Sequence, residues 1–323
     1  MRLGLTLAPL QGLGIRACVD LAAQVDTQGA SALWAPEVTG FDIMALLAAV
    51  AGSSTAMGLG IGVIPAPVRS PPLLAMGAAA LEGLVGDRGV MLGVGVSSPV
   101  VVEQWHGREY PRQQLGWMRE YLTVLRMCLS GKRVSFHGEH FDISGFKLTV
   151  PMDSDNVKIV VGALNPGMLA VAGELADGVL LNYMPVDRVA ESVRVVKANG
   201  DASVYCYIHA GIDPDAKVLE DARRDLAGYC MAPGYVRHFG AAGFGRCVEA
   251  VRRGFEAGKR DEAYGAVSDE MLQSIKILGD ARHVSSAVER YMLAGVEEPI
   301  LFPLVGSGGA GDVLSTWTAL ADS

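Results

Sequence analysis

The residues that could do chemistry lie just after short, uncharged, glycine-rich runs of the chain. Two of these runs are residues 58–64 (GLGIGVI) and 89–95 (GVMLGVG), and a cluster of Pro, Ser or Gly follows each of them. Such runs are typical of strands buried on both faces, whose last residues enter loops at the carboxyl edge of a parallel sheet. Ligands of parallel α/β sheets bind at that edge. We therefore look for functional side chains directly after each strand.

Asn165 and Pro166 give the clearest signal for a ligand-binding site. Asn is a strong helix N-cap, and Pro suits the first helical position because its missing N–H is not needed there. A helix that begins here presents free backbone N–H groups with partial positive charge, and Gly162 and Gly167 add flexibility. The pattern predicts a phosphate-binding helix N-terminus, and a plain helix cap is the alternative.

Several other polar residues have both a functional and a structural interpretation. Ser97 and Ser98 could donate hydroxyl groups to a ligand, or they could cap the loop after the fourth strand. Trp105 and His106 lie in the loop that follows and could meet a substrate, although such pairs more often pack locally. Arg69 could pair with an anionic ligand or be a solvated loop arginine.

His137 and His140 have a spacing that suggests a metal site. A zinc site needs further ligands within reach, and Gly138 is expected to be the bend of a β-hairpin. We therefore interpret both histidines as structural and predict no metal site.

Eight predicted strands alternate with helices, which favours an α/β fold of the (β/α)8 TIM-barrel type. The competing doubly wound sheet would need a third glycine after Gly93 and Gly95, and the sequence lacks it. We expect one domain over residues 1–323, with a hairpin at 133–148 before strand five and a helical excursion at 214–276 between strands seven and eight. The strands are expected at residues 2–8, 31–35, 57–64, 89–95, 157–161, 178–182, 204–210 and 299–303, and the helices at 12–28, 43–51, 73–84, 113–129, 166–175, 186–198, 281–293 and 312–321.

The composition limits the class of protein. Half of the 323 residues are hydrophobic and 19% are charged, which favours a large buried core. The net charge of −8 argues against a nucleic-acid partner, whose phosphates need a basic surface. We see no signal peptide and no apolar run of the about 18 residues that a membrane span requires. Five cysteines without close pairing predict reduced thiols and a cytoplasmic location.

Five segments, in the expected order at the strand ends, resemble the luciferase-like flavin and deazaflavin oxidoreductases, the family of bacterial luciferase. The segment Trp34–Glu37 with Gly40, the pair Ser97-Ser98 and the segment Trp105–Gly107 look most like a subgroup that uses the deazaflavin coenzyme F420. The five segments are residues 33–38 (LWAPEV), 60–71 (GIGVIPAPVRSP), 93–98 (GVGVSS), 162–178 (GALNPGMLAVAGELADG) and 293–299 (LAGVEEP).

The resemblance implies where the cofactor would lie. In this family the third strand carries a non-proline cis peptide against the central ring of the cofactor, and the matching bond is Gly62–Val63. Glu37 would assist proton transfer, or it would cap the helix that starts near Asp42, and His106 is a second catalytic candidate. The predicted cofactor-binding residues are Gly62, Val63, Ser97, Ser98, Gly162, Ala163, Leu164, Asn165 and Asn182.

The resemblance also implies a function. We expect a coenzyme F420-dependent oxidoreductase that transfers a hydride between the deazaflavin and a small organic substrate. The alternatives are an FMN-dependent monooxygenase and a flavin-binding barrel without catalysis. Related sugar-phosphate dehydrogenases carry an acidic proton donor where this chain has Val96, so that reaction is not expected. A homodimer is expected through the helices at 43–51 and 73–84, which are almost uncharged.

Overall fold

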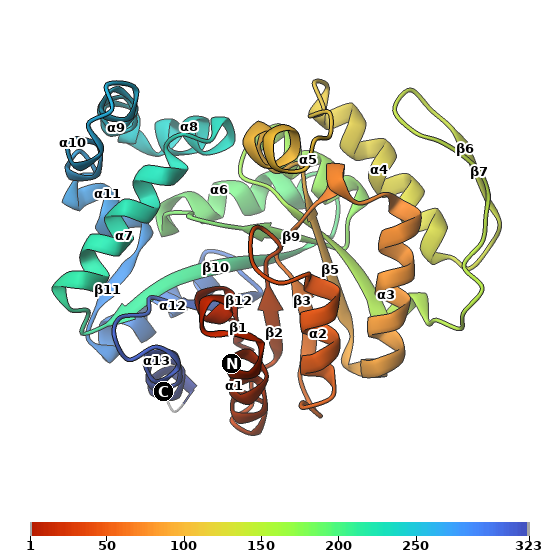
Figure 1. Cartoon of the computed structure of the whole chain (residues 1–323), viewed down its shortest axis with the longest axis horizontal. Coiled ribbons are helices and arrows are strands. Elements are labelled where there is room, and N and C mark those ends of the chain that lie inside the picture. Colours follow the sequence, from red (N-terminus) through yellow and green to blue (C-terminus); the bar gives the residue numbers. More distant parts are fainter. Residues whose placement is uncertain (1, 322–323) are drawn as a thin grey trace.

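The computed structural model describes residues 2–321, and its centre is a closed barrel of eight parallel strands (Figure 1). Each barrel strand pairs with the next, and β12 pairs with both β10 and β1, which closes the sheet. The predicted (β/α)8 fold is confirmed. The barrel strands are β1 (Gly4–Thr6), β2 (Ala32–Ala35), β3 (Gly58–Ile61), β5 (Val90–Gly95), β8 (Val157–Gly162), β9 (Gly178–Leu181), β10 (Ser203–Ile212) and β12 (Glu298–Pro303).

Two short strands add to the barrel. After a break at residues 62–63, β4 (Ile64–Pro65) continues the third strand and pairs with β5. The strand β11 (Ile277–Gly279) pairs with the last residues of β10. The sequence did not predict β11, because three residues after a helix carry too little pattern to be told from a loop.

The helices that cover the barrel begin and end where local chemistry directs. Asp42, Ser70 and Asp280 each accept a hydrogen bond from a backbone N–H in the first turn of the helix that follows. Gly29, which follows α1, has a φ of +82°, a conformation that favours glycine. These helices are α1 (Ile15–Thr27), α2 (Ile43–Ala51), α3 (Pro71–Val85), α4 (Gln114–Leu129), α5 (Pro166–Leu175), α6 (Val186–Lys197), α12 (Ala281–Leu293) and α13 (Ala310–Ala321).

Short helical turns connect several of these elements. A π-helix at Val100–Trp105 stands where the sequence predicted only a loop, and a second π-helix spans Gly240–Phe244. The 3-10 turn at Ala8–Leu13 explains why α1 starts later than residue 12. The other 3-10 turns are Ala66–Val68, Gly86–Arg88 and Ser154–Asn156.

Both predicted insertions are present, on opposite sides of the barrel (Figure 1). The antiparallel hairpin β6 (Val134–His137) and β7 (Asp142–Phe146) follows α4. Nδ1 of His137 lies 2.7 Å from Oδ1 of Asp142, so His137 pairs within the hairpin. The helical excursion consists of α7 (Ala216–Tyr229), α8 (Pro233–Phe239), α9 (Gly245–Glu256), α10 (Arg260–Gly265) and α11 (Asp269–Ile275).

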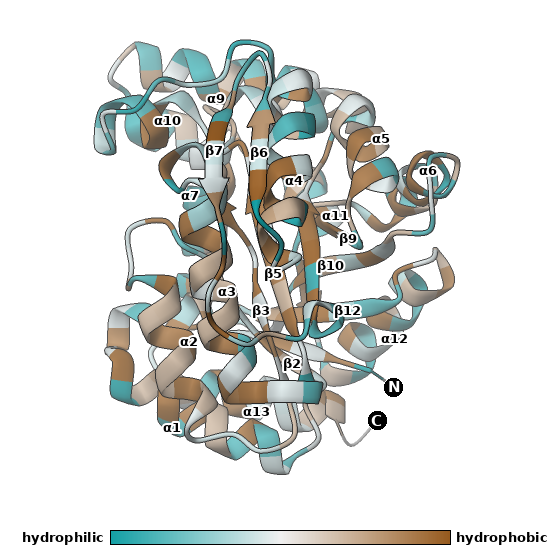
Figure 2. Cartoon of the chain, turned by 90° about the vertical axis from the view of Figure 1, so that its right-hand side faces the viewer, coloured by the Kyte–Doolittle hydropathy of each residue, from teal (hydrophilic) through white to brown (hydrophobic). Residues whose placement is uncertain are grey.

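The hydrophobic core has three parts. The largest fills the space between the strands and the surrounding helices, and a second lies within the helical excursion. The third fills the inside of the barrel. Figure 2 shows these buried strands mostly in brown, with teal residues concentrated at the surface. All five cysteines are free thiols. Among residues 2–321, no helix has the length and apolar composition needed to cross a membrane.

The carboxylate of Asp26, near the end of α1, fixes the start of β3. Its Oδ2 accepts hydrogen bonds from Thr55 N (2.7 Å) and Thr55 Oγ1 (3.1 Å). Its Oδ1 accepts from Ala56 N (3.0 Å) and Met57 N (2.9 Å). Burial alone would raise the pKa of Asp26, but these hydrogen bonds lower it below its usual value. The third strand is therefore anchored at its amino end by one ionised side chain.

Replacing Asp26 by Ala is expected to lower the free energy of unfolding by about 3 kcal/mol, because it leaves several backbone N–H groups without their acceptor. Since the folded pKa is lowered, this stabilisation is present above the unfolded value of about 3.9 and is lost as pH falls through the folded value. Urea unfolding between pH 3 and 7 measures both effects. Asp20→Ala on the exposed face of α1 is the control, and equal losses in the two variants would contradict the assignment.

Candidate active site

The peptide bond between Gly62 and Val63 is cis, as the family resemblance implies. Three hydrogen bonds hold the backbone around it. Gly62 N donates to Ala35 O (3.0 Å), and Glu37 N donates to Val63 O (3.3 Å). The hydroxyl of Tyr207, on β10, crosses the barrel interior and donates to Gly62 O (3.0 Å). The carboxyl end of the third strand is thus tied to β2 on one side and to β10 across the barrel.

Glycines on the neighbouring strands make room for the Val63 side chain. A Cβ atom added at Gly95 would lie 3.0 Å from Val63 Cγ2, and one at Gly162 would lie 3.2 Å from Val63 Cγ1. A Cβ atom at Gly93 would lie only 1.7 Å from Ile61 O. These glycines of β5 and β8 let the third strand approach closely and leave Val63 half-buried on top of them.

Glu37 lies in an ion cluster with Arg69 and Asp42. Arg69 Nε donates to Glu37 Oε2 (2.8 Å), and its Nη2 contacts Glu37 and Asp42 together. Glu37 Oε1 also accepts from Ile43 N (3.3 Å), which is the helix-start contact considered above. Hydrogen bonding to Glu37 raises the pKa of Arg69 although burial opposes it. Arg69 is therefore an internal ion-pair partner and not a solvated loop arginine.

The residues after β5 form a tight turn that leads into the π-helix. Ser98 Oγ accepts from Val101 N (3.4 Å), so this hydroxyl caps the π-helix. Ser97 has a φ of +60°, and its carbonyl accepts from Tyr110 OH (3.2 Å). His106 follows the π-helix and is exposed. The structure thus gives Ser98 a local role and leaves the predicted catalytic role of His106 untested.

Asn165 occupies the predicted N-cap position of α5, with Pro166 as the first helical residue. The prediction that its side chain caps the helix is wrong, because Asn165 Nδ2 donates to Gly234 O (3.3 Å) in α8. The backbone carbonyl of Asn165 instead accepts from Met168 N and Leu169 N, both at 3.0 Å. A long-range contact from the excursion therefore replaces the local cap that the residue type favours.

A buried polar network lies at the carboxyl ends of β9 and β10. His209 Nε2 lies 2.8 Å from Asn182 Oδ1, and Lys276 Nζ lies 3.3 Å from His209 Nδ1. Lys276 Nζ also donates to Asp225 Oδ2 (2.6 Å), which accepts from Tyr183 OH (2.8 Å) as well. Burial lowers the pKa of Lys276 while its pairing with Asp225 opposes this, and burial with the Lys276 charge holds the pKa of His209 well below its usual value.

Of the residues in this network, the sequence pattern indicated only Asn182. One signal was available, because Tyr205, Tyr207 and His209 alternate along the seventh strand and therefore share one face. Polar side chains at every second position of a buried strand predict a polar layer inside the barrel. Lys276 carries no such signal, since it is a single lysine at the end of a helix.

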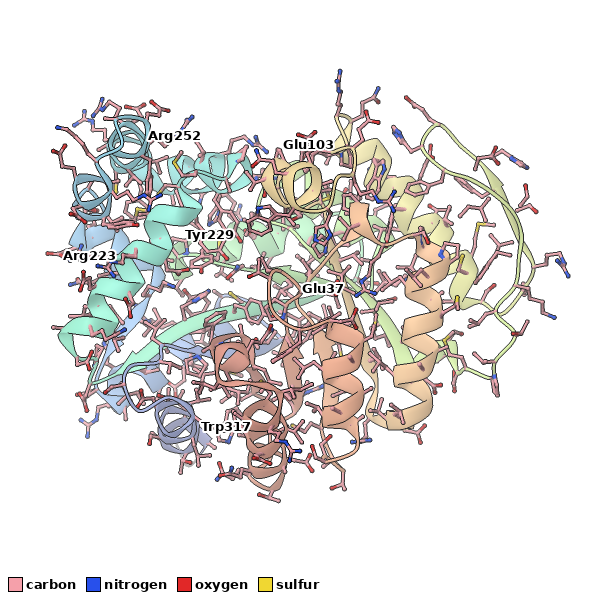
Figure 3. The ribbon with its side chains drawn as sticks, viewed as in Figure 1. Glu37, Glu103, Arg223, Tyr229, Arg252 and Trp317 are labelled. Atoms are coloured by element: carbon pink, nitrogen blue, oxygen red, sulfur yellow. The ribbon has the colours of Figure 1, made fainter. Side chains whose placement is uncertain are left out.

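The structure places all nine predicted cofactor-binding residues at what we call the barrel mouth, the carboxyl ends of the barrel strands. They lie at or just after the ends of β3, β5, β8 and β9, which are consecutive neighbours in the sheet. The helix α8 reaches this arc, since it contacts Asn165 and since Tyr235 OH accepts from Asn182 Nδ2 (3.0 Å). Figure 3 shows Glu37 near the centre of the view, with Tyr229 of the excursion to one side and Glu103 of the π-helix above it. The residues gathered on this arc are Gly62, Val63, Ser97, Ser98, Gly162, Ala163, Leu164, Asn165 and Asn182.

A parallel barrel whose polar groups gather at the carboxyl ends of its strands has the arrangement of TIM-barrel enzymes. The sequence matches the profile of the luciferase-like monooxygenase family over residues 3–298, and the chain belongs to that family.

Two relatives with known names are similar over most of their length. The chain is 28% identical to a Mycobacterium tuberculosis protein with the provisional name coenzyme F420-dependent oxidoreductase, over 92% of this chain and 93% of that protein. It is also 28% identical to the 5,10-methylenetetrahydromethanopterin reductase of Archaeoglobus fulgidus, over 82% of each chain. The solved structure of the coenzyme F420-dependent tetrahydromethanopterin reductase from Methanopyrus kandleri superimposes with a TM-score of 0.81 at 21% identity, covering 98% of this chain and 97% of the other. That likeness shows a shared fold.

Replacing Gly93 by Ala is expected to lower the free energy of unfolding by about 3 kcal/mol, a large effect for overpacking. The reason is that the added methyl would meet the backbone carbonyl of Ile61, which cannot move without shifting a strand. Gly83→Ala is the matched control, because a Cβ atom at Gly83 in α3 meets nothing within 4 Å. This control should gain about 0.5–1 kcal/mol from helix propensity. Urea unfolding of both variants decides, and a fully stable Gly93→Ala protein would refute the proposed close packing.

Proposed function

We propose that this protein is a coenzyme F420-dependent oxidoreductase that transfers a hydride between the deazaflavin and a small organic substrate. The observation that carries the proposal is the arc of the barrel mouth, where the apolar side chain of Val63, the start of α5 and the Asn182 amide follow β3, β8 and β9, three strands of the consecutive run β3-β5-β8-β9. The name of the Mycobacterium tuberculosis relative, which mentions coenzyme F420, supports this choice of cofactor.

The side chains at the barrel mouth fit a planar ring with an anionic tail. Val63 offers a half-buried apolar side chain that packs on the glycines of β5 and β8. The N-terminus of α5 begins with Pro166 and Gly167, where the backbone N–H groups of a helix lack partners within the helix and favour an anion. We therefore place the ring against Val63 and the phosphate tail at residues 162–165.

When bound, coenzyme F420 supplies the hydride donor or acceptor, and the protein orients the two reactants. Val63 would cover one face of a bound ring, which would leave the other face for the substrate. The aromatic side chains of Tyr229 and Tyr235 contact each other, with ring centroids 4.7 Å apart, and help to exclude water from this side of the mouth. Glu37 and His106 are the side chains that we propose for the accompanying proton transfer.

An FMN-dependent monooxygenase is the second candidate, and the description of the matched family favours it. The same Val63 side chain and helix N-terminus would bind the ring and the phosphate of FMN. The two functions differ in their use of oxygen, because reduced flavin reacts readily with oxygen and reduced deazaflavin does not. A flavin-binding barrel without catalysis is the remaining alternative, and it would bind a cofactor without turnover.

Titration of the purified protein with coenzyme F420 and with FMN tests the assignment. We expect coenzyme F420 to bind saturably, which its fluorescence reports, and we expect turnover to proceed without oxygen consumption. Val63→Asp should weaken this binding at least about tenfold, because it places an unpaired carboxylate against the ring. Val38→Asp is the control, since Val38 is already exposed. Tight binding of FMN alone, or oxygen uptake during turnover, would overturn the deazaflavin assignment.

We also propose that the protein forms a homodimer through α2 and α3. Leu73, Met76 and Leu84 of α3 are 49%, 54% and 52% exposed, and their spacing places them near one face of the helix. In Figure 2 both helices are mostly brown and beige. A second copy of the chain would cover this apolar face.

Met76→Arg is expected to convert the dimer to a monomer, because it places a charge at the centre of the proposed apolar face. Size-exclusion chromatography with light scattering measures the mass directly. Leu293→Arg is the matched control, since Leu293 is 88% exposed at the end of α12 and should leave the mass unchanged. A wild-type protein that is monomeric at micromolar concentration would exclude this interface.

A further inference from the structure

In the buried network behind the barrel mouth, each hydrogen bond has a defined donor and acceptor. This order determines whether Asn182 presents its NH2 group or its oxygen to a ligand. We propose that Lys276, acting through His209, holds the amide of Asn182 in one orientation so that its NH2 group is the hydrogen-bond donor at the mouth. The acceptor that we expect for this NH2 group is a carbonyl oxygen of a bound ring, and this part of the proposal rests on the proposed function. The relay itself lies within the protein and can be tested without any ligand.

The first step of the relay is set by Lys276, which is 1% exposed and lies between α11 and β11. Its ammonium group donates to Asp225 Oδ2 (2.6 Å) and lies 4.6 Å from the centre of the Tyr183 ring. The remaining contact is His209 Nδ1 at 3.3 Å. An ammonium group has no acceptor, so Nδ1 must accept and the ring proton must lie on Nε2.

The second step passes from His209 to Asn182. Because Nε2 carries the proton, it donates to Asn182 Oδ1 across 2.8 Å. The amide oxygen therefore points inward, and Asn182 Nδ2 points toward the excursion and donates one hydrogen to Tyr235 OH (3.0 Å). Its second hydrogen remains for another acceptor. A flipped amide would bring two N–H donors together at His209, so the relay excludes that orientation.

Aromatic packing keeps the relay rigid. The imidazole of His209 stacks between Phe302 and Tyr183, with both ring centroids 4.2 Å away. Asn182 directly follows β9, two residues after Leu180. A Cβ atom on Gly62 would lie 2.8 Å from Leu180 Cδ2, so β9 packs directly against the cis unit. The Asn182 amide thus lies close to Val63, against which we place the ring.

The charges around His209 explain why the hydrogen bonds of the relay should keep their direction when the pH changes. Two titratable groups contact His209 directly, Lys276 and Tyr183. Around these two lie Asp225 of α7, which contacts both, and Tyr229 and Tyr235 of the excursion, whose rings contact Tyr183. Lys276 is the cation of this set. Burial and this positive charge hold the pKa of His209 well below its usual value. We therefore expect the imidazole to stay neutral, and the direction of the relay to stay the same, between pH 5.5 and 8.

The direct test uses nitrogen-15 NMR of the histidine side chains in the ligand-free protein, with His209 assigned from the signal lost in His209→Gln. We expect a protonated Nε2 and an unprotonated Nδ1 whose shifts do not change between pH 5.5 and 8. In Lys276→Met the ring should change its tautomer or begin to titrate in this range. Lys217→Met is the control, because Lys217 is exposed on α7 and pairs with Asp221. A wild-type His209 protonated on Nδ1 would overturn the proposal.

The consequence for binding is measured by a double-mutant cycle with coenzyme F420. Lys276→Met and Asn182→Ala should each weaken binding about three- to tenfold, the effect of one lost hydrogen bond. The double variant should bind no more weakly than Asn182→Ala, because Lys276 acts through that side chain. Additive losses would overturn the relay, since a purely structural role of Lys276 predicts them.

Variants at His209 keep the test valid if Lys276→Met does not fold. His209→Gln retains an N–H donor toward Asn182 and should retain most of the affinity, whereas His209→Leu should lose about as much as Asn182→Ala. Equal affinity of these two variants would refute the relay. Failure of coenzyme F420 to bind the wild-type protein would overturn the proposed function and the ligand-binding role of Asn182, while the ligand-free tautomer would still test the relay.

Discussion

The close approach of the third strand to β5 is the constraint on which the rest of the site depends. A methyl group at Gly93 would lie 1.7 Å from a backbone oxygen of that strand, so only glycine allows the contact. The same absence of side chains at Gly95 and Gly162 gives Val63 its position at the mouth. Glycines in buried strands normally weaken a sheet. Here the glycines lower the local stability of the sheet but allow Val63 to take its position. The hydrogen bonds from Asp26 to the start of β3 offset part of this loss of stability.

The ion cluster and the buried network each hold a partly or fully buried cation beside the barrel mouth, on two different sides. A buried charge is costly unless it is paired and hydrogen-bonded. Arg69 pairs with two carboxylates and links the loops after β2 and β4, whereas Lys276 pairs with Asp225 of the excursion and contacts His209 of β10. Each cation therefore connects a segment outside the barrel to a strand or strand end of the barrel. We infer that the loops around the barrel mouth are positioned by charge pairs, while apolar packing builds the barrel beneath them.

The sequence predicted elements well and side-chain partners poorly. All eight barrel strands, both insertions and the limits of α2, α5 and α12 were correct, because local pattern and capping chemistry determine them. Asn165 shows where this reasoning stops, since its position was correct but its side chain bonds to a residue 69 positions away. Lys276 and Asp225 had no local signal at all. Only the fold brings together groups from the excursion and the strands, so contacts of this kind cannot be obtained from spacing alone.

The proton donors that we propose differ in how firmly the structure holds them. Val96 occupies the position where related sugar-phosphate dehydrogenases carry an acid, and it packs against the hydrophobic core. The carboxylate of Glu37 contacts Arg69 and the start of α2, so proton transfer through it would require these contacts to loosen. His106 is exposed and needs no such rearrangement. If both act, Glu37 serves the ring side of the mouth, where its backbone meets Val63, and His106 serves the solvent side. This division would suit a substrate that enters past the π-helix.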